Sequence, residues 1–528
     1  MNKTLRRFFI LIYVLLFVWT LFLVFGMQRV LNVMCSKNFP LENAGFFIIG
    51  GFVIIFIFWI NNRYGEQIES FLQKKYRSIL SISLVGLLVW QIYSCYGGYF
   101  LSGWDAGLIR DTVGLQYNHD YSHLNNEYFS WFPNNMLLVW IFKAVARFAG
   151  LVGYTNWEFS LVVFQCLIDI ISIWLVYRVT YDFAKNQRVA FFTYLIAFLF
   201  IGISPWFIVA YSDATGILFP IIIIRIYQLV MHSENKMVRT IWSIILGFVS
   251  IAGSLIKPQI LIAFIAVVLT EICCLFGKAF KHRLHDFIIR VLCYAIGIMA
   301  FFVLYNNIVI PTLHFQRDTD STIGWQHYFM MGLNVSRDGV YSDEDYVFTK
   351  SFSTNEERNE ANLQEAKKRI KELGIGGLFQ HLSRKQLVNY GDGTFAWNVE
   401  GNSFAGDPEW AYNGISDFVR SFIKPDGINY NWFISFKQLI WIMVLFLLLF
   451  VFVYPRRILS SYGDNCIIVL AMSIIGLTIF ELLFEARARY LFCYAPLFVI
   501  LSGWGLRNIY SLIYHYGFLQ MPHLLEKG

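Results

Sequence analysis

Long apolar runs recur along this chain, and short polar connections separate them. Most runs extend over about 20 residues, the length that a helix needs to cross the hydrocarbon core of a bilayer. The pattern predicts an all-α polytopic membrane protein with about twelve transmembrane helices. We place these helices at 8–27, 45–61, 79–96, 156–177, 188–204, 207–225, 240–256, 259–277, 288–306, 434–454, 465–483 and 491–512.

The charges in the connections predict the orientation of the chain. Lysine and arginine gather in connections such as "NNRYGEQIESFLQKKYR", "HSENKMVR" and "YPRR". Short connections rich in these residues stay in the cytoplasm. Both termini are therefore expected in the cytoplasm, and two long segments, 97–155 and 307–433, are expected outside.

This topology divides the chain into five parts. The first outer loop is expected to carry interfacial helices, because its stretch 134–148 is amphipathic and too polar to span. The parts are helices one to three (1–96), the first extracytoplasmic loop (97–155), helices four to nine (156–306), an extracytoplasmic module (307–433), and the last three helices with a cytoplasmic tail (434–528).

The second outer segment predicts a small, mostly helical module. Ser353 and Glu356 have the S-x-x-E spacing of a capping box at the start of a polar helix. Gly374 is suited to the left-handed conformation that ends many helices. We expect a helix between these two points that packs on the membrane domain.

Composition agrees with a membrane protein and excludes several functions. Only 15% of the residues are charged, against about 25% in soluble domains. The net charge of +7 comes from the connections, so it does not indicate nucleic-acid binding. The scattered cysteines form no CxxC pair, which argues against a zinc site. No phosphate loop or dinucleotide fingerprint is present, which argues against a soluble nucleotide donor.

Asp105 is the first candidate for chemistry. It lies in "SGWDAGLIRD", just after a predicted span, at the outer membrane surface. It either caps the helix that follows or acts as a general base whose pKa is raised by desolvation. Arg110 and Asp111 lie about 140° and 240° around a helix from Asp105, so the three side chains do not share one face.

Further polar residues are expected at the same side of the membrane. Asp213 in "YSDATG", Lys257 in "SLIKPQ" and the pair Arg487 and Arg489 in "FEARARYLF" all fall at outer ends of spans. Arginines and a lysine are the usual ligands of a phosphate group. The alternative for the arginines is interfacial anchoring, but anchoring cations favour the cytoplasmic side.

His327 in "GWQHYFMMGLN" and the pair Asn134 and Asn135 in "FPNN" are weaker candidates. His327 either contacts a substrate or is a hydrogen-bonded structural histidine. The asparagines either touch a sugar or cap the interfacial helix, and capping is the simpler interpretation.

Three features resemble the GT-C superfamily of glycosyltransferases: an aspartate in the first outer loop, Y-[ST]-D at a later outer end and E-x-R-x-R-Y near the last span. The nearer branch contains the protein O-mannosyltransferases and the lipid A aminoarabinose transferase. More closely, the chain resembles polytopic members from Gram-positive bacteria in the motifs "WDAG", "YFSWFPNN", "YSDATGILFP", "HYFMMGLN", "YGDGTFAW" and "EARARYL". The resemblance covers most of the chain, and it implies a GT-C fold.

The resemblance implies an inverting sugar transfer from a polyprenyl-phosphate donor, such as undecaprenyl phosphate, at the outer face of the cell membrane. Asp105 matches the catalytic carboxylate that deprotonates the acceptor. Arg487 and Arg489 would bind the donor phosphate, with Lys257 and Arg110 as further candidates. The acceptor would be a teichoic acid, a wall polysaccharide or a protein of the cell envelope.

The resemblance leaves the second carboxylate and the cofactor open. The mannosyltransferases have an acidic residue directly after the first aspartate, whereas Ala106 stands there in this chain. Asp111, Asp120 and Asp213 remain as candidates, and Tyr490 completes the last motif as a substrate contact. No cofactor is implied, because mannosyltransferases of this branch generally need no metal, although a divalent metal stays open.

Two other functions are compatible with the sequence. One is a ligase or polymerase that joins a whole lipid-linked glycan to an acceptor. The other is a lipid or sugar transporter. Transporters often have paired broken helices in two halves, whereas this chain places about a third of its length in two outer segments, which favours chemistry at the outer face.

Overall fold

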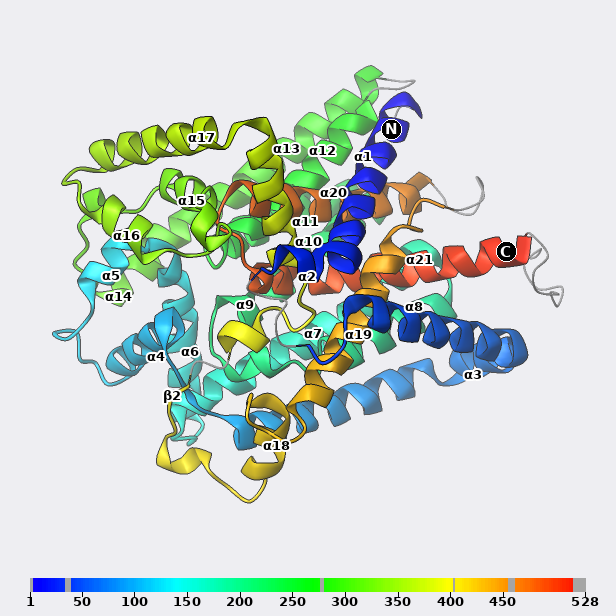
Figure 1. The fold of residues 1–528 in the computed structure, drawn as a ribbon, viewed down its shortest axis with the longest axis horizontal. Coiled ribbons are helices and arrows are strands. Elements are labelled where there is room, and N and C mark those ends of the chain that lie inside the picture. Colours follow the sequence, from blue (N-terminus) through cyan, green and yellow to red (C-terminus); the bar gives the residue numbers. More distant parts are fainter. Residues whose placement is uncertain (1–2, 34–38, 276–279, 402–403, 454–460, 516–528) are drawn as a thin grey trace.

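The computed structural model is almost entirely helical (Figure 1). Within its described residues, ten helices are long and apolar enough to cross a membrane. The predicted all-α polytopic membrane fold is therefore confirmed. The structure describes residues 3–33, 39–275, 280–401, 404–453 and 461–515.

Ten apolar helices among the described residues form the membrane domain, and the other helices pack on it or between its spans. The spanning candidates are α1 (Lys3–Phe22), α3 (Asn43–Gly98), α7 (Trp157–Ala184), α10 (Leu218–His232), α11 (Lys236–Ser254), α12 (Leu261–Leu275), α13 (Phe280–Leu304), α19 (Tyr430–Leu448), α20 (Ser461–Leu483) and α21 (Ala495–His515). The other described helices are α2 (Gln28–Leu31), α4 (Trp104–Tyr117), α5 (Asn126–Trp131), α6 (Met136–Leu151), α8 (Gln187–Phe200), α9 (Ser212–Gly216), α14 (Ile310–Leu313), α15 (Trp325–Gly332), α16 (Asp343–Lys350), α17 (Asn355–Tyr390) and α18 (Ser416–Ile423).

Helix α3 contains two of the predicted spans. Its first arm packs on α19, where the rings of Phe47 and Phe446 lie 5.0 Å apart. Its second arm runs against α7, where Tyr76 stacks on Tyr177 and Cys95 contacts Cys166. Figure 1 shows the chain turning back between the arms, so the predicted spans at 45–61 and 79–96 both exist within one helical stretch. The predicted span at 188–204 corresponds to the shorter helix α8.

Asparagine caps fix the starts of several helices. The side chain of the residue before α5, α7, α8 and α11 accepts a backbone N–H of the first turn in each case, and these residues are Asn125, Asn156, Asn186 and Asn235. Each cap satisfies a donor that the helix itself leaves unpaired. The helix starts are thus encoded locally, while the apolar faces determine what each helix packs against.

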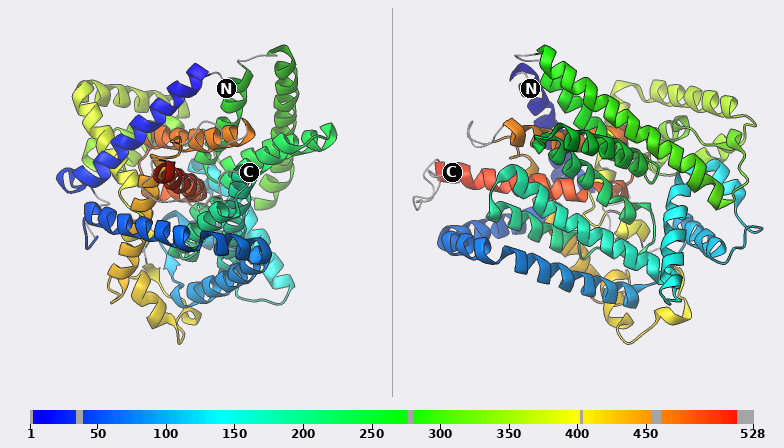
Figure 2. Two further views of the ribbon diagram at one scale, coloured as in Figure 1. Left: turned by 90° about the vertical axis from the view of Figure 1, so that its right-hand side faces the viewer. Right: turned by 180° about the vertical axis from the view of Figure 1, so that it is seen from behind.

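The shorter helices of the two long segments gather at one end of the molecule, away from the C-terminus (Figures 1 and 2). Helices α4 and α6 come from the first segment, and α15, α16 and α17 come from the second. The two segments also share a small antiparallel sheet, in which β1 (Leu101–Ser102) pairs with β2 (Phe404–Gly406). This end of the protein is therefore built jointly by parts that are far apart in the sequence.

The polar helix of the second segment starts one residue later than predicted. Its capping box consists of Thr354 and Glu357 instead of Ser353 and Glu356. The same spacing of hydroxyl and carboxylate occurs one position further along, and the threonine hydroxyl accepts the Glu357 N–H at 3.2 Å. Gly374 has φ +59°, as expected for a helix end, but the chain resumes the helix directly after this kink.

The second half of α17 does not stay outside the membrane domain. Residues 385–398 are almost fully buried. Gln386 donates to Thr20 of α1, and Tyr390 bonds to Thr478 of α20 at 2.6 Å. The middle of the segment predicted as an extracytoplasmic module therefore inserts between the helices, where Thr20 and Thr478 of the bundle bond two of its polar side chains.

Candidate functional site

A cavity of about 1030 Å³ lies where the two long segments meet the ends of several spans. Its walls come from α4, the turn before α6, α15, and the connection between α20 and α21. Most of the predicted site residues line it together. They are Asp105, Asn134, Asn135, Lys257, His327, Arg487, Arg489 and Tyr490.

Asp105 lies in the first turn of α4, with its carboxylate in the cavity. The residue at the N-cap position is Gly103, so the interpretation of Asp105 as the helix cap is wrong. The turn is tight: a Cβ at Gly107 would lie 2.4 Å from the carbonyl oxygen of Ser102. A glycine there lets the backbone approach closely enough to turn Asp105 inward.

Two tyrosines hydrogen-bond the Asp105 carboxylate. The hydroxyl of Tyr211 donates to Oδ2 at 3.3 Å, and Tyr128 makes a second bond. Asn135 in turn donates to the Tyr128 hydroxyl at 2.7 Å. Because this hydroxyl oxygen already accepts a hydrogen bond from Asn135, its own O–H is directed to Asp105. Asn135 precedes α6 but makes no side-chain cap, so the capping interpretation is wrong for this residue.

Burial raises the pKa of Asp105 above its usual value. The positive charge of Arg489 and the bonds from Tyr128 and Tyr211 oppose this effect, and the carboxylate of Glu485 adds to it. A carboxylate with a raised pKa is a stronger base than an exposed one. The surroundings of Asp105 therefore suit proton abstraction.

Trp104 connects Asp105 to Arg489. Its ring lies 4.6 Å from the guanidinium carbon of Arg489 and 4.9 Å from the ring of Tyr211. Trp104 also has φ +45°, an unfavourable conformation for a bulky residue. Such strain is kept only where surrounding contacts hold it, and it is typical of functional sites.

Glu485 is a second carboxylate of the cavity, and the sequence analysis did not identify it. It is 7% exposed, accepts Arg487 Nε at 2.8 Å, and accepts the Tyr490 hydroxyl at 2.9 Å. It is the first residue of the "EARARY" motif, so a carboxylate two positions before an arginine of that motif was an available signal. The ion pair fixes Arg487 at the cavity wall.

Lys257 and Asp213 form a buried ion pair at the edge of the cavity. Lys257 lines the cavity and lies 4.6 Å from the centre of the Tyr490 ring. Asp213 is 1% exposed and is not among the lining residues. Asp213 thus holds the lysine instead of facing a substrate.

The connection that carries the arginines is held by residues of the second long segment. Lys385 of α17 donates to the backbone oxygens of Gly332, Leu482 and Phe484 at 2.9, 2.8 and 2.5 Å. The backbone N–H of Ala486 donates to Gly339 at 2.8 Å. The second segment therefore positions the loop that contains the arginine pair.

His327 is a hydrogen-bonded histidine that also lines the cavity, and its contact with a substrate stays a prediction. Its Nδ1 lies 2.7 Å from the Thr349 hydroxyl, which itself donates to Asn362. The ring is therefore protonated at Nδ1 and leaves Nε2 as an acceptor. Burial lowers its pKa to about 4, so the ring is neutral at ordinary pH.

Three predicted residues lie elsewhere. Arg110 pairs with its neighbour Asp111 at 2.6 Å, and the Asp111 side chain is 65% exposed. Asp120 bonds His123 at 2.7 Å on the surface. Arg110, Asp111 and Asp120 are not among the residues that line the cavity of about 1030 Å³. Within the described residues, no group of three or more histidines, cysteines, aspartates or glutamates could hold a metal ion.

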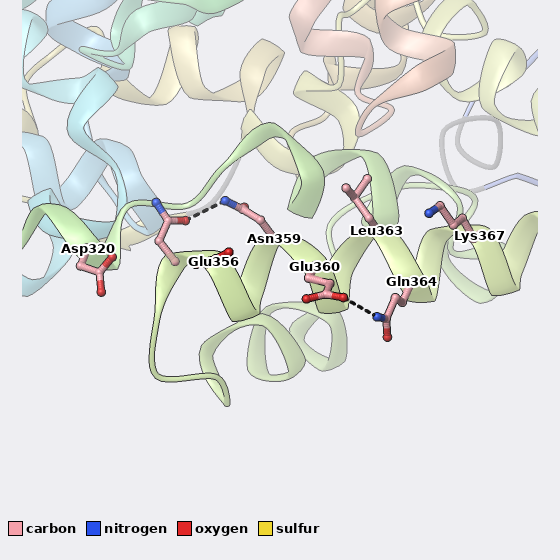
Figure 3. A pocket seen from close by; sticks show the side chains of 8 residues that line it. Asp320, Glu356, Asn359, Glu360, Leu363, Gln364 and Lys367 are labelled. Carbon is pink, nitrogen blue, oxygen red and sulfur yellow. Dashed lines mark hydrogen bonds between the residues drawn. The ribbon is translucent and has the colours of Figure 1, made fainter.

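A shallower hollow of about 660 Å³ follows the exposed side of α17 (Figure 3). Its polar side chains bond to one another along the helix. Asn359 donates to Asn355, and Gln364 donates to Glu360, each at 3.0 Å. Such pairs four residues apart are ordinary surface features of a helix, so this hollow is not our candidate site.

The chain matches a family described as "Conserved hypothetical integral membrane protein" over residues 1–508. No curated protein matches it. Similar solved structures include the Archaeoglobus fulgidus oligosaccharyltransferase in complex with zinc and sulfate, at 14% identity and TM-score 0.32 over 81% of this chain. This chain spans about half, 52%, of that protein's chain. ArnT from Cupriavidus metallidurans, bound to undecaprenyl phosphate, is 15% identical, with TM-score 0.33 over 82% of this chain and 78% of its own.

Proposed function

The chain belongs to the family of conserved hypothetical integral membrane proteins, and we propose that it is an inverting membrane glycosyltransferase of the GT-C type. The donor is a sugar on a polyprenyl phosphate, such as undecaprenyl phosphate. The acceptor is a hydroxyl group of a cell-envelope polymer or protein, such as a teichoic acid or wall polysaccharide. We place the reaction at the outer face of the cell membrane.

One observation carries this proposal. A carboxylate, Asp105, and the arginine pair Arg487 and Arg489 line the same cavity at the ends of membrane-spanning helices. Sugar transfer needs a base for the acceptor and cations for the departing phosphate. The cavity supplies both kinds of group.

The proposed reaction is a single displacement at the anomeric carbon. Asp105 takes the proton of the acceptor hydroxyl while that oxygen attacks the sugar from the face opposite the phosphate. A new bond forms between the acceptor oxygen and the anomeric carbon, and the bond from that carbon to the phosphate oxygen breaks. The polyprenyl phosphate leaves with the bonding electrons, and Asp105 holds the proton.

The arginines stabilise the charge that develops on the leaving phosphate. Arg487 is fixed by Glu485, and Arg489 is held against Trp104. Donors already held in place do not have to reorganise during the reaction, which is why they stabilise a transition state well. Lys257, anchored by Asp213, adds a point charge at the same wall.

The remaining walls favour a lipid-linked sugar over a soluble one. Apolar side chains at the ends of the spans, Ile256, Pro258, Phe480 and Phe484, line one part of the cavity. Aromatic residues line another part, including Trp131 and Tyr328. Mostly apolar walls with a few convergent polar groups are typical of small-molecule sites, and here they fit a donor with a hydrocarbon tail.

The direct test is an in vitro transfer reaction with the purified full chain in lipid nanodiscs. The reaction contains a radiolabelled polyprenyl-phosphate sugar and a cell-envelope extract as acceptor. We expect label in the extract and one polyprenyl phosphate released per sugar transferred, with inverted anomeric configuration in the product. Asp111→Asn is the control, because this exposed carboxylate lies outside the cavity.

The same reaction separates the alternatives. A ligase or polymerase would transfer a whole glycan from a lipid-linked oligosaccharide and not a single sugar. A transporter would carry the labelled lipid or sugar across the membrane with no covalent product. Either result would refute the proposed single-sugar transfer.

A further inference from the structure

A separate cavity of about 620 Å³ lies at the opposite end of the bundle from the candidate site. It is enclosed by the region where the chain turns back in α3, the start of α8 and the end of α21, all at the right-hand side of Figure 1. The residues that border it near the turn of α3 include Asn61, Asn62 and Gly65. It shares no lining residue with the candidate site.

The interior of this cavity is largely apolar. Side chains from four helical segments form its walls, among them Ile57, Phe58, Leu72, Phe192, Leu195 and Leu506. Leu195 is 39% exposed on the surface of the spanning helices. The apolar part of the cavity is therefore in reach of the hydrocarbon of the surrounding membrane.

Arginines border the polar part of the cavity. They are Arg63, Arg188 and Arg507. Arg188 is neutralised by Glu69 at 2.7 Å. Glu66 also lines the cavity, but it points from an exposed position of α3. The arginines thus exceed the carboxylates at this wall.

Arg507 is the cation that stands out. Its guanidinium carbon lies 4.6 Å from the centre of the Trp504 ring, and its Nη1 donates to the Asn508 side-chain oxygen at 3.4 Å. No carboxylate among the residues that the structure describes forms an ion pair with it. A half-buried guanidinium near hydrocarbon is costly unless an anion or water compensates its charge.

We propose that this cavity binds the phosphate headgroup of an anionic membrane phospholipid, with Arg507 as the principal phosphate ligand. Arginine matches a phosphate with paired hydrogen bonds, and Arg63 adds positive charge at the rim. The acyl chains fill the apolar part, which a free anion would leave in contact with water. The lipid then ties both arms of α3 to α8 and α21.

The proposal does not depend on the proposed function, because it concerns different residues at the other end of the protein. A bound ligand that prefers the folded state stabilises it by mass action. The expected role of the lipid is therefore to stabilise the packing of these helices, and its binding is measurable without any enzyme assay.

The test uses the purified, delipidated full chain in detergent. Native mass spectrometry counts bound lipid during titration with phosphatidylglycerol, and thermal unfolding is followed in parallel. We expect one tightly held phosphatidylglycerol and a raised Tm. Arg507→Gln should weaken this binding about tenfold or more, the loss expected for a charge-assisted hydrogen bond.

Arg178→Gln is the matched control. Arg178 also lies over a tryptophan of a spanning helix, 6.0 Å from the Trp174 ring, but it does not line the cavity. The Arg178→Gln variant should bind phosphatidylglycerol as tightly as the unmodified chain does. Leu195→Trp, which fills the apolar part without touching a charge, should also reduce binding.

Three results would overturn the proposal. The first is equal binding by Arg507→Gln and the unmodified chain. The second is equal binding of phosphatidylcholine, which would remove the role of the headgroup charge. The third is full stabilisation by inorganic phosphate alone, which would assign the site to a free anion.

Discussion

Asp105 and Arg489 line one cavity, although they come from the first long segment and from the start of the last span. Arg489 lies against the ring of Trp104, the neighbour of Asp105, and its charge lowers the pKa of that carboxyl against the effect of burial. The proposed base and a proposed phosphate ligand are therefore coupled electrostatically. A substitution of Arg489 should therefore change the pH at which Asp105 ionises.

This coupling predicts how activity depends on pH. Asp105 must be ionised to accept a proton, so kcat/KM should fall as pH decreases through its raised pKa. Arg489→Gln removes an attraction that favours the ionised form. The fall of kcat/KM on the acidic side of the pH profile, its acidic limb, should then move to a pH about 1 unit higher. Full pH profiles of kcat/KM measure the shift.

Arg110→Gln is the control for this prediction. Arg110 pairs with an exposed carboxylate outside the cavity, so its removal should leave the acidic limb in place. An unchanged limb in Arg489→Gln would show that the arginine does not act on Asp105.

The bond from Asn135 to Tyr128 predicts a positioning effect. Asn135→Ala frees the Tyr128 hydroxyl to rotate, so Asp105 loses an oriented donor. We expect kcat to fall about tenfold with little change in KM, as for a lost hydrogen bond near 1.4 kcal/mol. Steady-state kinetics at saturating donor measure this effect.

A double-mutant cycle separates this effect from general damage. If Asn135 acts only through Tyr128, then Asn135→Ala combined with Tyr128→Phe should cost no more than Tyr128→Phe alone. Additive losses would contradict the proposed relay.

The buried pair of Lys257 and Asp213 predicts a loss of stability. Asp213→Ala leaves Lys257 buried without its partner. Breaking a buried ion pair in this way costs about 3–5 kcal/mol. Thermal unfolding in detergent should show a clear decrease in Tm. The double variant Asp213→Ala, Lys257→Met should recover most of it, and no recovery would argue that Asp213 has a role beyond holding the lysine.

Lys385 should position the arginine loop from a distance. Lys385→Met removes the donor to the oxygens of Leu482 and Phe484, next to the arginines. We expect the KM for the lipid donor to rise while the acidic limb of the pH profile stays in place. Lys371→Met, on the exposed face of the same helix, should leave KM unchanged. A shifted acidic limb in Lys385→Met would instead connect this residue to Asp105.

Hydropathy predicted the spans because the membrane constrains them strongly. A helix in lipid must be apolar over its whole width, and its length is set by the bilayer. The turn of α3 was expected as a connection, because "NNRYGEQIESFLQKKYR" is polar. It is helical in the structure, since glutamate, glutamine and lysine are good helix formers. Polarity alone does not distinguish a polar helix from a loop.

The site was predicted only as far as each residue could be assigned to a side of the membrane. Asp105, Lys257 and the arginine pair were expected together because all were predicted at outer ends of spans, and they line one cavity. Tyr128 and Tyr211 lie in the motifs "YFSWFPNN" and "YSDATG". In a chain with 19% aromatic residues, no pattern marks which tyrosines reach a carboxylate.

The structure does not place Arg110 where the sequence analysis expected it. Arg110 was a candidate phosphate ligand, but it pairs with Asp111 at the next position. Adjacent residues on a helix point about 100° apart, and only the long reach of arginine closes this pair. The rotamer of a long side chain is decided by its surroundings and is not visible in a sequence pattern.

The central claim is that Asp105 is the base of a sugar transfer. The most direct measurement is the single-turnover rate of transfer from a labelled polyprenyl-phosphate sugar by Asp105→Asn, compared with Asp111→Asn. We predict that Asp105→Asn folds and binds donor but transfers about 10²–10⁴ times more slowly, as expected for loss of general base catalysis. Asp111→Asn should react at the rate of the unmodified chain. An undiminished rate in a correctly folded Asp105→Asn protein would contradict the account.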